Sequence, residues 1–347
     1  MIHLDGIIFS LQSHGGISVY FRELLSRLAT QQEPSLLTLE RPQRAELDKL
    51  PAKMREQRPA RALERYRACR PPSAVRASLF HSSYYRLPRQ RGMPSVVTVH
   101  DFAYERCVGG LRTWVHATQK YAAIRQAQAI ICISEATRDD LLEFVGVRSD
   151  QSLHVVYNGV SEGFQAVEVP AGAGAGAGAG FALFIGQRGR YKNFALALAA
   201  LEHLPDLELH CVGGGPIQEH ELAGAVESVR ARVKHLGPVD DVELNRLYNT
   251  AQCLVYPSAY EGFGIPVLEA MRAGCPVVGI DCKAVKEVGG DALVVAEQAR
   301  GDALAEAIRV TAGSSRNTLR ERSMARASHF SWDRCFAQTL AVYRSLT

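Results

Sequence analysis

The chain has 347 residues, of which 47% are hydrophobic and 22% charged, the composition of a globular protein long enough for two domains. No apolar run approaches the ~20 residues of a membrane-spanning helix, and the first residues lack the basic-then-apolar pattern of a signal peptide. The eight cysteines are scattered without a C-x-x-C pair, which favours reduced, buried thiols in a cytoplasmic protein over a zinc site.

The net charge of +4 is unevenly distributed. Between Arg41 and Arg91, 14 Lys and Arg stand against four Asp and Glu, a local net charge of +10. Such a segment is either a solvated helical face or a patch that holds the protein near an anionic membrane or a phosphate-bearing acceptor. We expect no nucleic-acid partner, because aromatic residues are not interleaved with these charges and no nucleic-acid-binding motif is present.

Apolar runs of strand length alternate with helical runs along the first half of the chain. The predicted strands are Ile2–Phe9, Leu36–Leu39, Ser78–His81, Val96–Val99, Ala129–Ile133 and Leu153–Val156. The predicted helices are Ser18–Ala29, Ala45–Cys69, Leu111–Gln126 and Ala136–Phe144.

The second half repeats this alternation. Its predicted strands are Ala182–Ile185, Glu208–Val212, Val233–His235, Cys253–Tyr256, Val277–Ile280 and Ala292–Val295. Helices are predicted over Ala195–Leu204, Asp241–Asn249, Pro266–Ala273 and Ser331–Leu346. Strands that are apolar on both faces and separated by helices indicate parallel sheets covered on both sides.

Residues 171–180 alternate Ala and Gly, which predicts a flexible linker or surface loop because such a run has little to bury. Each side of this run has its own set of strands and helices. The sequence therefore predicts an α/β protein with two Rossmann-like, doubly wound domains, residues 1–165 and 166–330. The last helix, within residues 331–347, is expected to pack back on the first domain.

The strongest chemical signal is the segment Tyr256–Met271. A predicted strand ends at Tyr256, a glycine-rich turn follows, and Pro266 stands in the first turn of the next helix. A strand, a glycine loop and a helix N-terminus present free backbone amides to an anion such as a diphosphate. Glu261 lies in the loop, and Glu269 lies in an apolar helical run, where a carboxylate needs partners such as sugar hydroxyls. The alternative is a capping carboxylate and an ordinary helix glutamate.

This segment resembles the E-x7-E signature of family 4 glycosyltransferases, which have the GT-B fold of two domains facing across a cleft. The resemblance implies that Glu261 lies by the donor sugar and that Glu269 binds the nucleotide ribose. It also implies that the backbone amides of Phe263, Gly264 and Ile265 face the donor phosphates or sugar.

The loop Phe184–Phe194 places several cations after a strand, which suits a diphosphate that gains charge as it leaves. Arg188 and Lys192 resemble the arginine–lysine pair that stabilises the leaving nucleotide diphosphate in that family. Gln187 stands where the family often has the arginine, so Arg190 is a rival for the role.

The first domain supplies further candidates at the ends of strands, where ligands bind in open α/β sheets. Gly15 and Gly16 resemble the glycine loop that approaches phosphate or acceptor. His100 resembles the histidine that hydrogen-bonds the donor sugar, and Asp101 either orients it or helps to deprotonate the acceptor. In the second domain, Gly213 begins a Gly-Gly-Gly turn that is expected near the donor base and is no dinucleotide fingerprint.

The resemblance implies a transfer that retains the anomeric configuration. No Asp-x-Asp motif is present to hold a metal, so the cations of the loop predict transfer without metal or other cofactor. The resemblance also implies a nucleotide-diphosphate sugar as donor, with GDP-mannose expected first and UDP-hexoses or dTDP-rhamnose after it. The predicted acceptor is a lipid-linked oligosaccharide of surface polysaccharide (O-antigen, lipopolysaccharide) synthesis, met at the inner face of the cytoplasmic membrane.

Three alternatives stay open from the sequence alone. A non-catalytic GT-B subunit that binds a partner glycosyltransferase would not need the charged and acidic candidates above. A nucleotide-sugar epimerase would use a similar fold. A phosphorylase would need a lysine in a pyridoxal-phosphate context, which the sequence does not offer.

Overall fold

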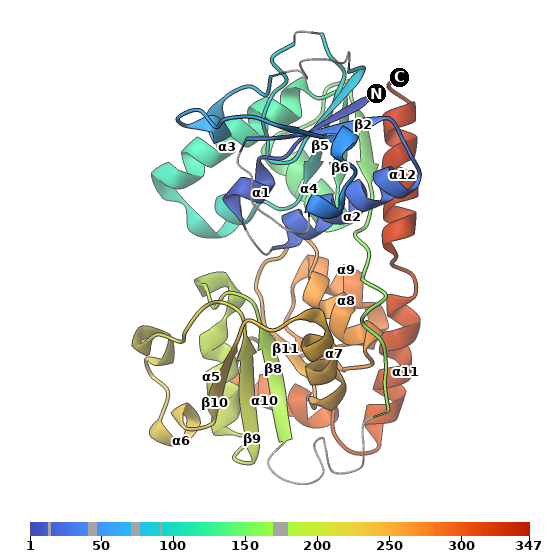
Figure 1. Ribbon diagram of the computed structural model, residues 1–347. Helices are drawn as coiled ribbons and strands as arrows, with labels where there is room; N and C mark the ends of the chain where they lie inside the picture. Colours follow the sequence, from blue (N-terminus) through green and yellow to red (C-terminus); the bar gives the residue numbers. More distant parts are fainter. Residues whose placement is uncertain (13–14, 41–46, 71–76, 91, 169–179) are drawn as a thin grey trace. The chain divides into compact units, whose positions relative to one another are not determined.

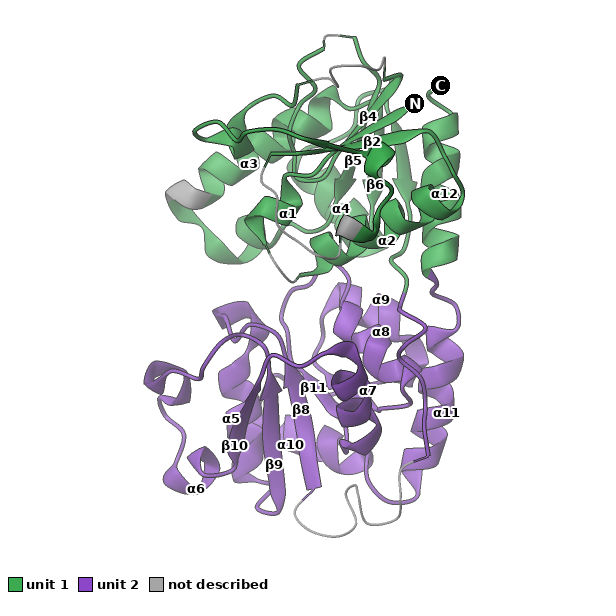
Figure 2. Ribbon diagram, viewed as in Figure 1, with its two compact units in different colours: residues 1–159, 332–347 green, residues 160–331 purple. Residues whose placement is uncertain are grey.

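The computed structural model describes residues 1–12, 15–40, 47–70, 77–90, 92–168 and 180–347 (Figure 1). It divides into two compact units, unit 1 with residues 1–159 and 332–347, and unit 2 with residues 160–331 (Figure 2). The division falls after residue 159, where the sequence suggested 165, and the C-terminal helix from residue 332 belongs to unit 1. Most of the Ala-Gly run lies outside the described residues, and Gly180 begins a strand.

Unit 1 contains a parallel sheet in the order β3-β2-β1-β4-β5-β6-β7. Its strands are β1 Ile2–Asp5, β2 Ser35–Leu39, β3 Arg55–Gln57, β4 Leu79–Ser82, β5 Ser95–Val99, β6 Ala129–Cys132 and β7 Ser152–Val155. The central strands are buried along their whole length, as expected for a sheet covered on both faces.

The helices of unit 1 are α1 Ile8–Leu11, α2 Gly16–Thr30, α3 Gly110–Gln126, α4 Glu135–Phe144 and α12 Trp332–Arg344. Short helical turns are η1 Leu47–Lys49, η2 Ala52–Met54, η3 Glu64–Tyr66 and the π-helical η4 Tyr104–Val108. α4 begins where Ser134 accepts a hydrogen bond from the Thr137 amide at 2.9 Å, as an N-cap does.

The C-terminal helix α12 joins unit 1 through buried hydrogen bonds as well as apolar packing. The Tyr343 hydroxyl lies 2.5 Å from Nδ1 of His81 on β4, and the Thr339 hydroxyl lies 3.5 Å from that of Tyr20 on α2. Its apolar face, which includes Trp332, is also buried. Residues more than 300 positions apart in sequence therefore form one core.

Unit 2 contains a second parallel sheet, in the order β10-β9-β8-β11-β12-β13. Its strands are β8 Gly180–Ile185, β9 Leu207–Val212, β10 Val233–Gly237, β11 Leu254–Tyr256, β12 Val277–Gly279 and β13 Leu293–Val295. Its helices are α5 Phe194–Glu202, α6 Glu227–Arg230, α7 Asp241–Thr250, α8 Ile265–Arg272, α9 Lys283–Gly289, α10 Gly301–Val310 and α11 Ser315–Ala327. Short 3-10 turns are η5 Arg190–Lys192, η6 Glu219–Leu222 and η7 Gly290–Ala292.

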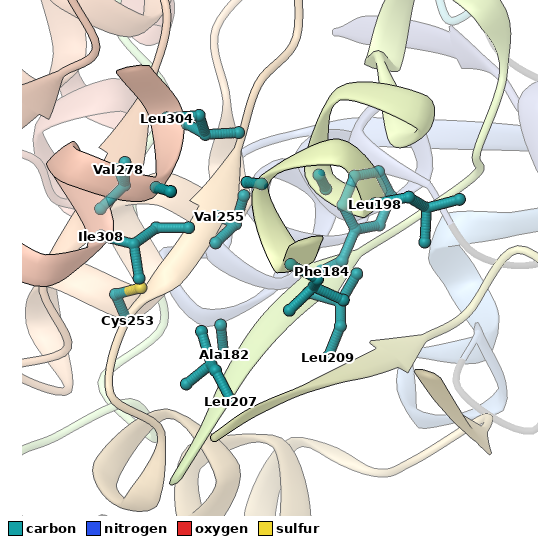
Figure 3. Close-up of a cluster of buried hydrophobic side chains, with 14 of the residues drawn as sticks. Ala182, Phe184, Leu198, Leu207, Leu209, Cys253, Val255, Val278, Leu304 and Ile308 are labelled. Carbon is teal, nitrogen blue, oxygen red and sulfur yellow. The ribbon is translucent and has the colours of Figure 1, made fainter. Parts of the chain in front are cut away.

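The core of unit 2 packs α5 and α10 against the middle of this sheet (Figure 3). Phe184 of β8 and Val255 of β11 lie in the same cluster as Leu198 of α5 and Ile308 of α10. Each of these side chains is at most 3% exposed, so the sheet and its helices are held by continuous apolar contact.

The predicted fold class, two Rossmann-like parallel-sheet domains, is confirmed, and each predicted strand has a counterpart. Two predicted elements are wrong in extent or kind. The strand expected over Ile2–Phe9 ends at Asp5, and α1 follows. The helix expected over Ala45–Cys69 is replaced, where the structure describes it, by 3-10 turns and β3, because Pro51 and Pro59 interrupt any helix there.

Two further features bear on the expectations of location and chemistry. None of the described helices combines the length and apolar character that a membrane span needs. All eight cysteines are free thiols, seven of them buried, and Cys107 is the exposed exception.

Candidate active site

The sheet of unit 2 reverses its strand order at β8, which has β9 on one side and β11 on the other. Ligands of open parallel sheets bind outside the carboxyl ends of the strands at such a reversal. The loops after β8 and β11 are tied together there, because the Ala259 amide donates to the Tyr191 carbonyl at 2.8 Å. The side-chain amide of Asn193 also donates to the Pro257 carbonyl at 3.0 Å. These two loops carry most of the candidate donor-site residues.

Lys192 forms a close ion pair with Glu261, with 2.5 Å between Nζ and Oε1. Its ammonium also donates to the hydroxyl of Tyr256, the last residue of β11, at 3.4 Å. The two charged side chains are only 15% and 11% exposed, so water screens them weakly. Glu261 and Tyr256 therefore fix a cation at the carboxyl edge of the sheet, and the sequence had not singled out Tyr256 for this role.

Arg188 is turned toward the loop Gly213–Pro216 that follows β9. Its Nε donates to the Glu221 carboxylate at 3.0 Å, Nη1 to the Gly213 carbonyl at 3.1 Å and Nη2 to the Gly215 carbonyl at 2.8 Å. The side chain is 1% exposed. Since every guanidinium nitrogen is engaged, the geometry favours Arg188 as a positioning residue that holds this loop. Direct contact with a leaving diphosphate stays a prediction.

The loop itself requires glycine. Gly213, Gly214 and Gly215 have φ angles of 75°, 73° and 74°, in the left-handed region. A Cβ on Gly214 would lie 2.6 Å from the Gly186 carbonyl oxygen. The three glycines thus let the loop after β9 approach the loop after β8. The Gly213 amide donates a hydrogen bond to the Gly237 carbonyl at 3.3 Å.

Arg190 differs from Arg188 in its surroundings. It is the first residue of η5 and is exposed. Its carbonyl accepts a hydrogen bond from the Asn193 amide at 3.2 Å, but its side chain makes no hydrogen bond or ion pair with the described part of the chain. Of the two rival arginines, Arg190 is therefore the one whose guanidinium remains available to an anion.

Helix α8 begins directly after the loop that carries Glu261. Gly264 stands at its N-cap with φ 101°, Pro266 lies in the first turn, and no side chain caps the helix. Phe263 is buried in edge contact with Phe330, with 6.0 Å between ring centroids, which fixes the entry to the helix. The first amides, including that of Ile265, and the positive end of the helix dipole suit a bound anion.

Glu269, one turn further along α8, is partly buried and accepts a hydrogen bond from the Tyr248 hydroxyl at 3.0 Å. Burial raises the pKa of Glu269 to about 7, although the Tyr248 hydrogen bond opposes the rise. Near neutral pH this carboxyl therefore changes between an acceptor-only carboxylate and a protonated donor. The sequence predicted a carboxylate in need of partners here, but it did not identify Tyr248 as one of them.

The raised pKa of Glu269 predicts that binding of a nucleotide sugar depends on pH. If ionised Glu269 accepts hydroxyl hydrogen bonds from the donor, affinity for a nucleotide-diphosphate sugar should rise up to about tenfold from pH 6 to pH 8. In Glu269→Gln the rise should vanish. The measurement is calorimetric titration with an intact nucleotide sugar, whose phosphodiester groups do not titrate in this range. An equally steep pH dependence in Glu269→Gln would refute this role.

In unit 1, His100 directly follows β5 and is 5% exposed. Burial lowers the pKa of its imidazole to about 3, so the ring is neutral at physiological pH. It lies edge-on to Tyr20, with 5.3 Å between centroids. Its Nε2 is buried and has no hydrogen-bond partner among the described residues, which leaves one ring nitrogen available to a ligand.

Asp101 and its neighbours form a small charged cluster in unit 1. The Asp101 carboxylate accepts a hydrogen bond from the Ala103 amide at 3.0 Å, and its backbone carbonyl accepts one from Lys120 at 3.1 Å. Lys120 is fully buried and pairs with Glu105 at 2.7 Å. Asp101 thus organises the turn after His100, and the sequence missed the Lys120–Glu105 pair because the two residues lie on different elements.

Gly15 and Gly16 open helix α2 after β1 and α1. Gly15 is the N-cap residue, no side chain caps the helix, and the Ser18 hydroxyl donates to the Gly15 carbonyl at 2.9 Å. A Cβ on Gly15 would meet the end of the Gln12 side chain at 2.8 Å, which can move aside. The start of α2 is therefore an uncapped helix N-terminus, as the predicted glycine loop requires.

The structure places the predicted residues in two sets, each within one unit. In unit 2, Lys192 contacts Glu261, Arg188 contacts the Gly213–Pro216 loop, and Glu269 contacts Tyr248. In unit 1, His100 follows β5, and the glycine loop lies between α1 and α2. Within the described residues, no group of three or more His, Cys, Asp or Glu could hold a metal ion.

Comparisons with known proteins agree on the class of this chain. Residues 14–163 match the family model described as Glycosyltransferase Family 4, and residues 180–312 match the model described as Glycosyl transferases group 1. An O-antigen chain mannosyltransferase B from Escherichia coli is 28% identical over 288 residues, covering 77% of this chain and 74% of that protein.

Two solved structures share the fold over 99% of this chain. Sucrose-phosphate synthase from Thermosynechococcus elongatus has a TM-score of 0.80 at 20% identity, and 98% of that chain is covered. HepE from Anabaena, solved in complex with UDP-glucose, has a TM-score of 0.75 at 17% identity, and 99% of that chain is covered.

The matches and the two parallel-sheet units define the protein as a glycosyltransferase, an enzyme that transfers glycosyl groups. More particularly, the first half of the chain is similar to glycosyltransferase family 4, and the second half is similar to the group 1 glycosyl transferases.

Proposed function

We propose that this chain is a retaining, metal-independent hexosyltransferase that takes its sugar from a nucleotide-diphosphate donor. The observation that carries the proposal is the Lys192–Glu261 pair beside the uncapped start of α8, at the strand reversal of unit 2. A cation and open helix amides at one sheet edge stabilise a diphosphate most when its charge grows during departure.

Lys192, and Arg190 with its uncommitted guanidinium, are the groups that we assign to the leaving diphosphate. Arg188 acts through the Gly213–Pro216 loop that its guanidinium holds. Protein cations and a helix N-terminus then do the charge neutralisation that a metal does in other transferases. On this proposal, EDTA leaves donor hydrolysis unchanged, and EDTA-sensitive activity would refute the metal-independent reaction.

For the sugar, we propose mannose from GDP-mannose, with UDP-hexoses and dTDP-rhamnose next. Support comes from the similarity to a mannosyltransferase of O-antigen chains, whereas the similarity to a UDP-glucose-bound structure keeps UDP-hexoses in the test. We propose a lipid-linked saccharide acceptor, as in O-antigen and lipopolysaccharide synthesis. We also place the enzyme in the cytoplasm, on the inner face of the membrane, where the basic segment 41–91 would meet anionic lipid.

The resemblance to retaining enzymes supports front-face attack, in which the leaving phosphate accepts the acceptor proton. The neutral His100, with its open Nε2, suits a hydrogen bond to a sugar hydroxyl better than proton transfer, because its pKa of about 3 keeps it unprotonated. Asp101 orients the turn that carries His100.

A panel of nucleotides tests the proposal directly. The purified chain is mixed with GDP, UDP, dTDP and their sugars, and its melting temperature is measured. A ligand at 100 times its Kd should stabilise the protein by about 2.7 kcal/mol, with the largest shift for GDP-mannose. Release of nucleoside diphosphate from the best ligand should follow. No shift and no turnover with any sugar nucleotide would overturn the proposed function.

A further inference from the structure

Two neighbouring cavities lie at the carboxyl ends of β1, β2 and β3 in unit 1, apart from the residues assigned above. The polar cavity has about 700 Å³ and the apolar cavity about 240 Å³. Glu40, Arg61 and Glu64 line both of them. The two cavities therefore adjoin at these three residues, and we call the pair the hollow, with a polar half and an apolar half.

The polar cavity is lined by an excess of positive charge. Four arginines, Arg58, Arg61, Arg70 and Arg89, face three glutamates. Arg58 pairs with Glu56 at 2.5 Å, and Arg61 pairs with Glu64 at 2.5 Å. Arg70 and Arg89 are exposed and have no ion pair with any described residue. Two uncommitted guanidinium groups at one cavity suit a phosphate.

The apolar cavity is lined by Ile7, Leu11, Leu63 and Tyr66. Three of these side chains remain unusually exposed for their type, Leu63 by 73%, Tyr66 by 50% and Leu11 by 38%. Arg65 stacks over Tyr66 at 5.3 Å and over Tyr84 at 4.9 Å, which holds this segment against the rest of unit 1. Apolar side chains gathered around a hollow indicate an apolar ligand.

Glu40, in the shared wall, carries an unused acceptor. The residue is 6% exposed, and its Oε1 accepts a hydrogen bond from Nη1 of the buried Arg86 at 2.9 Å. Its Oε2 is buried and has no partner among the described residues. A buried carboxylate oxygen without a partner is costly, and a hydroxyl group of a ligand would satisfy it.

We propose that this hollow binds an amphiphile, with a phosphate-bearing saccharide head on Arg70, Arg89 and Glu40 and an alkyl chain over Leu63 and Tyr66. The inference deepens the proposed function and rests on it, because such a molecule would be the acceptor. Glu40 would accept hydrogen bonds from the saccharide hydroxyls, and Arg70 and Arg89 would bind the phosphate. The apolar half would shield the alkyl chain of the ligand from water.

The test uses the full chain and three soluble probes below their micellar concentrations: octyl phosphate, octyl glucoside and inorganic phosphate. Ligand-observed NMR should show octyl phosphate binding at least about tenfold more tightly than inorganic phosphate, since inorganic phosphate has no alkyl chain to fill the apolar half. Glu40→Gln should weaken octyl glucoside and leave octyl phosphate within about twofold, because only the sugar offers hydroxyl donors.

Matched variants locate the site. Leu63→Ser should weaken octyl phosphate by about tenfold and leave inorganic phosphate unchanged, whereas Arg89→Gln should weaken both phosphates severalfold. The controls are Val242→Ser, 80% exposed, and Arg322→Gln, also exposed, both in unit 2. Equal binding by all variants, or an equal loss in the controls, would overturn the inference.

Different results would refute the acceptor site and the proposed function. A chain that binds octyl phosphate in this hollow but no sugar nucleotide would refute the proposed function and show this site to be an amphiphile site alone. A chain that binds and hydrolyses the donor but loses nothing with Leu63→Ser, Arg89→Gln and Glu40→Gln would refute the acceptor site alone.

Discussion

Replacing Lys192 with alanine should lower kcat for donor turnover by about 100-fold or more. The ammonium lies at the carboxyl edge of β8 and β11, held by Glu261 at 2.5 Å and by Tyr256 at 3.4 Å. A cation placed before the reaction stabilises a growing charge without reorganising, so its loss raises the barrier more than it weakens ground-state binding. Steady-state release of nucleoside diphosphate measures the effect.

The control for this variant is Lys234→Ala in the same unit. Lys234 lies on β10, is 48% exposed and is 3.6 Å from Glu208, so its removal tests the loss of a surface charge alone. Glu261→Gln should weaken activity too, since the lysine then loses the carboxylate that positions it. Activity of Lys192→Ala within about threefold of the parent would contradict its assignment to the leaving diphosphate.

The fold could be predicted because its signal is local. Strands such as Ala129–Cys132 and Val277–Gly279 are short apolar runs between helical periods, and the pattern alone locates them within a residue or two. β3 was missed because Arg55–Gln57 has no apolar residue. It is a strand only because it pairs with β2 at the edge of the sheet.

The sequence predicted the site residues that belong to local motifs. It could not predict contacts between residues that are far apart in the sequence. Lys192 and Glu261 are 69 residues apart, yet each follows a strand that the sequence located, so their meeting at one sheet edge follows from topology. The direction of Arg188 could not be predicted, because it depends on three carbonyls in a left-handed glycine loop and on Glu221.

The sequence pattern did not predict a buried ionic cluster in unit 1. Arg86 is fully buried, donates to Glu40 at 2.9 Å and to Glu64 at 2.8 Å, and lies 3.8 Å from the Asp5 carboxylate. These residues come from the ends of different strands and from η3, so only the folded chain brings them together. Within the basic segment 41–91, this arginine is therefore a structural residue rather than part of a charged surface.

Replacing Arg86 with methionine should destabilise unit 1 by about 3–5 kcal/mol, because it leaves buried carboxylates without their cation. Burial already raises the pKa of Asp5 and of Glu40, and Arg86 opposes both rises. Without it, the folded-state pKa of each carboxyl should rise further above its unfolded value. The folded state then binds more protons, so the loss of stability should be larger at pH 8 than at pH 5.

Denaturant unfolding followed by tryptophan fluorescence isolates this effect, since Trp114 and Trp332 are the two tryptophans and both belong to unit 1. The control is Arg89→Met, an exposed arginine of the same segment, which should stay within about 0.5 kcal/mol of the parent at both pH values. Equal losses for Arg86→Met at pH 5 and pH 8 would mean that lost packing, rather than unpaired charge, accounts for the destabilisation. A loss no larger than that of Arg89→Met would show that the cluster does not stabilise the fold.

Because Glu40 lies in both this cluster and the proposed acceptor hollow, Arg86→Met should also weaken octyl glucoside binding under conditions in which unit 1 remains folded.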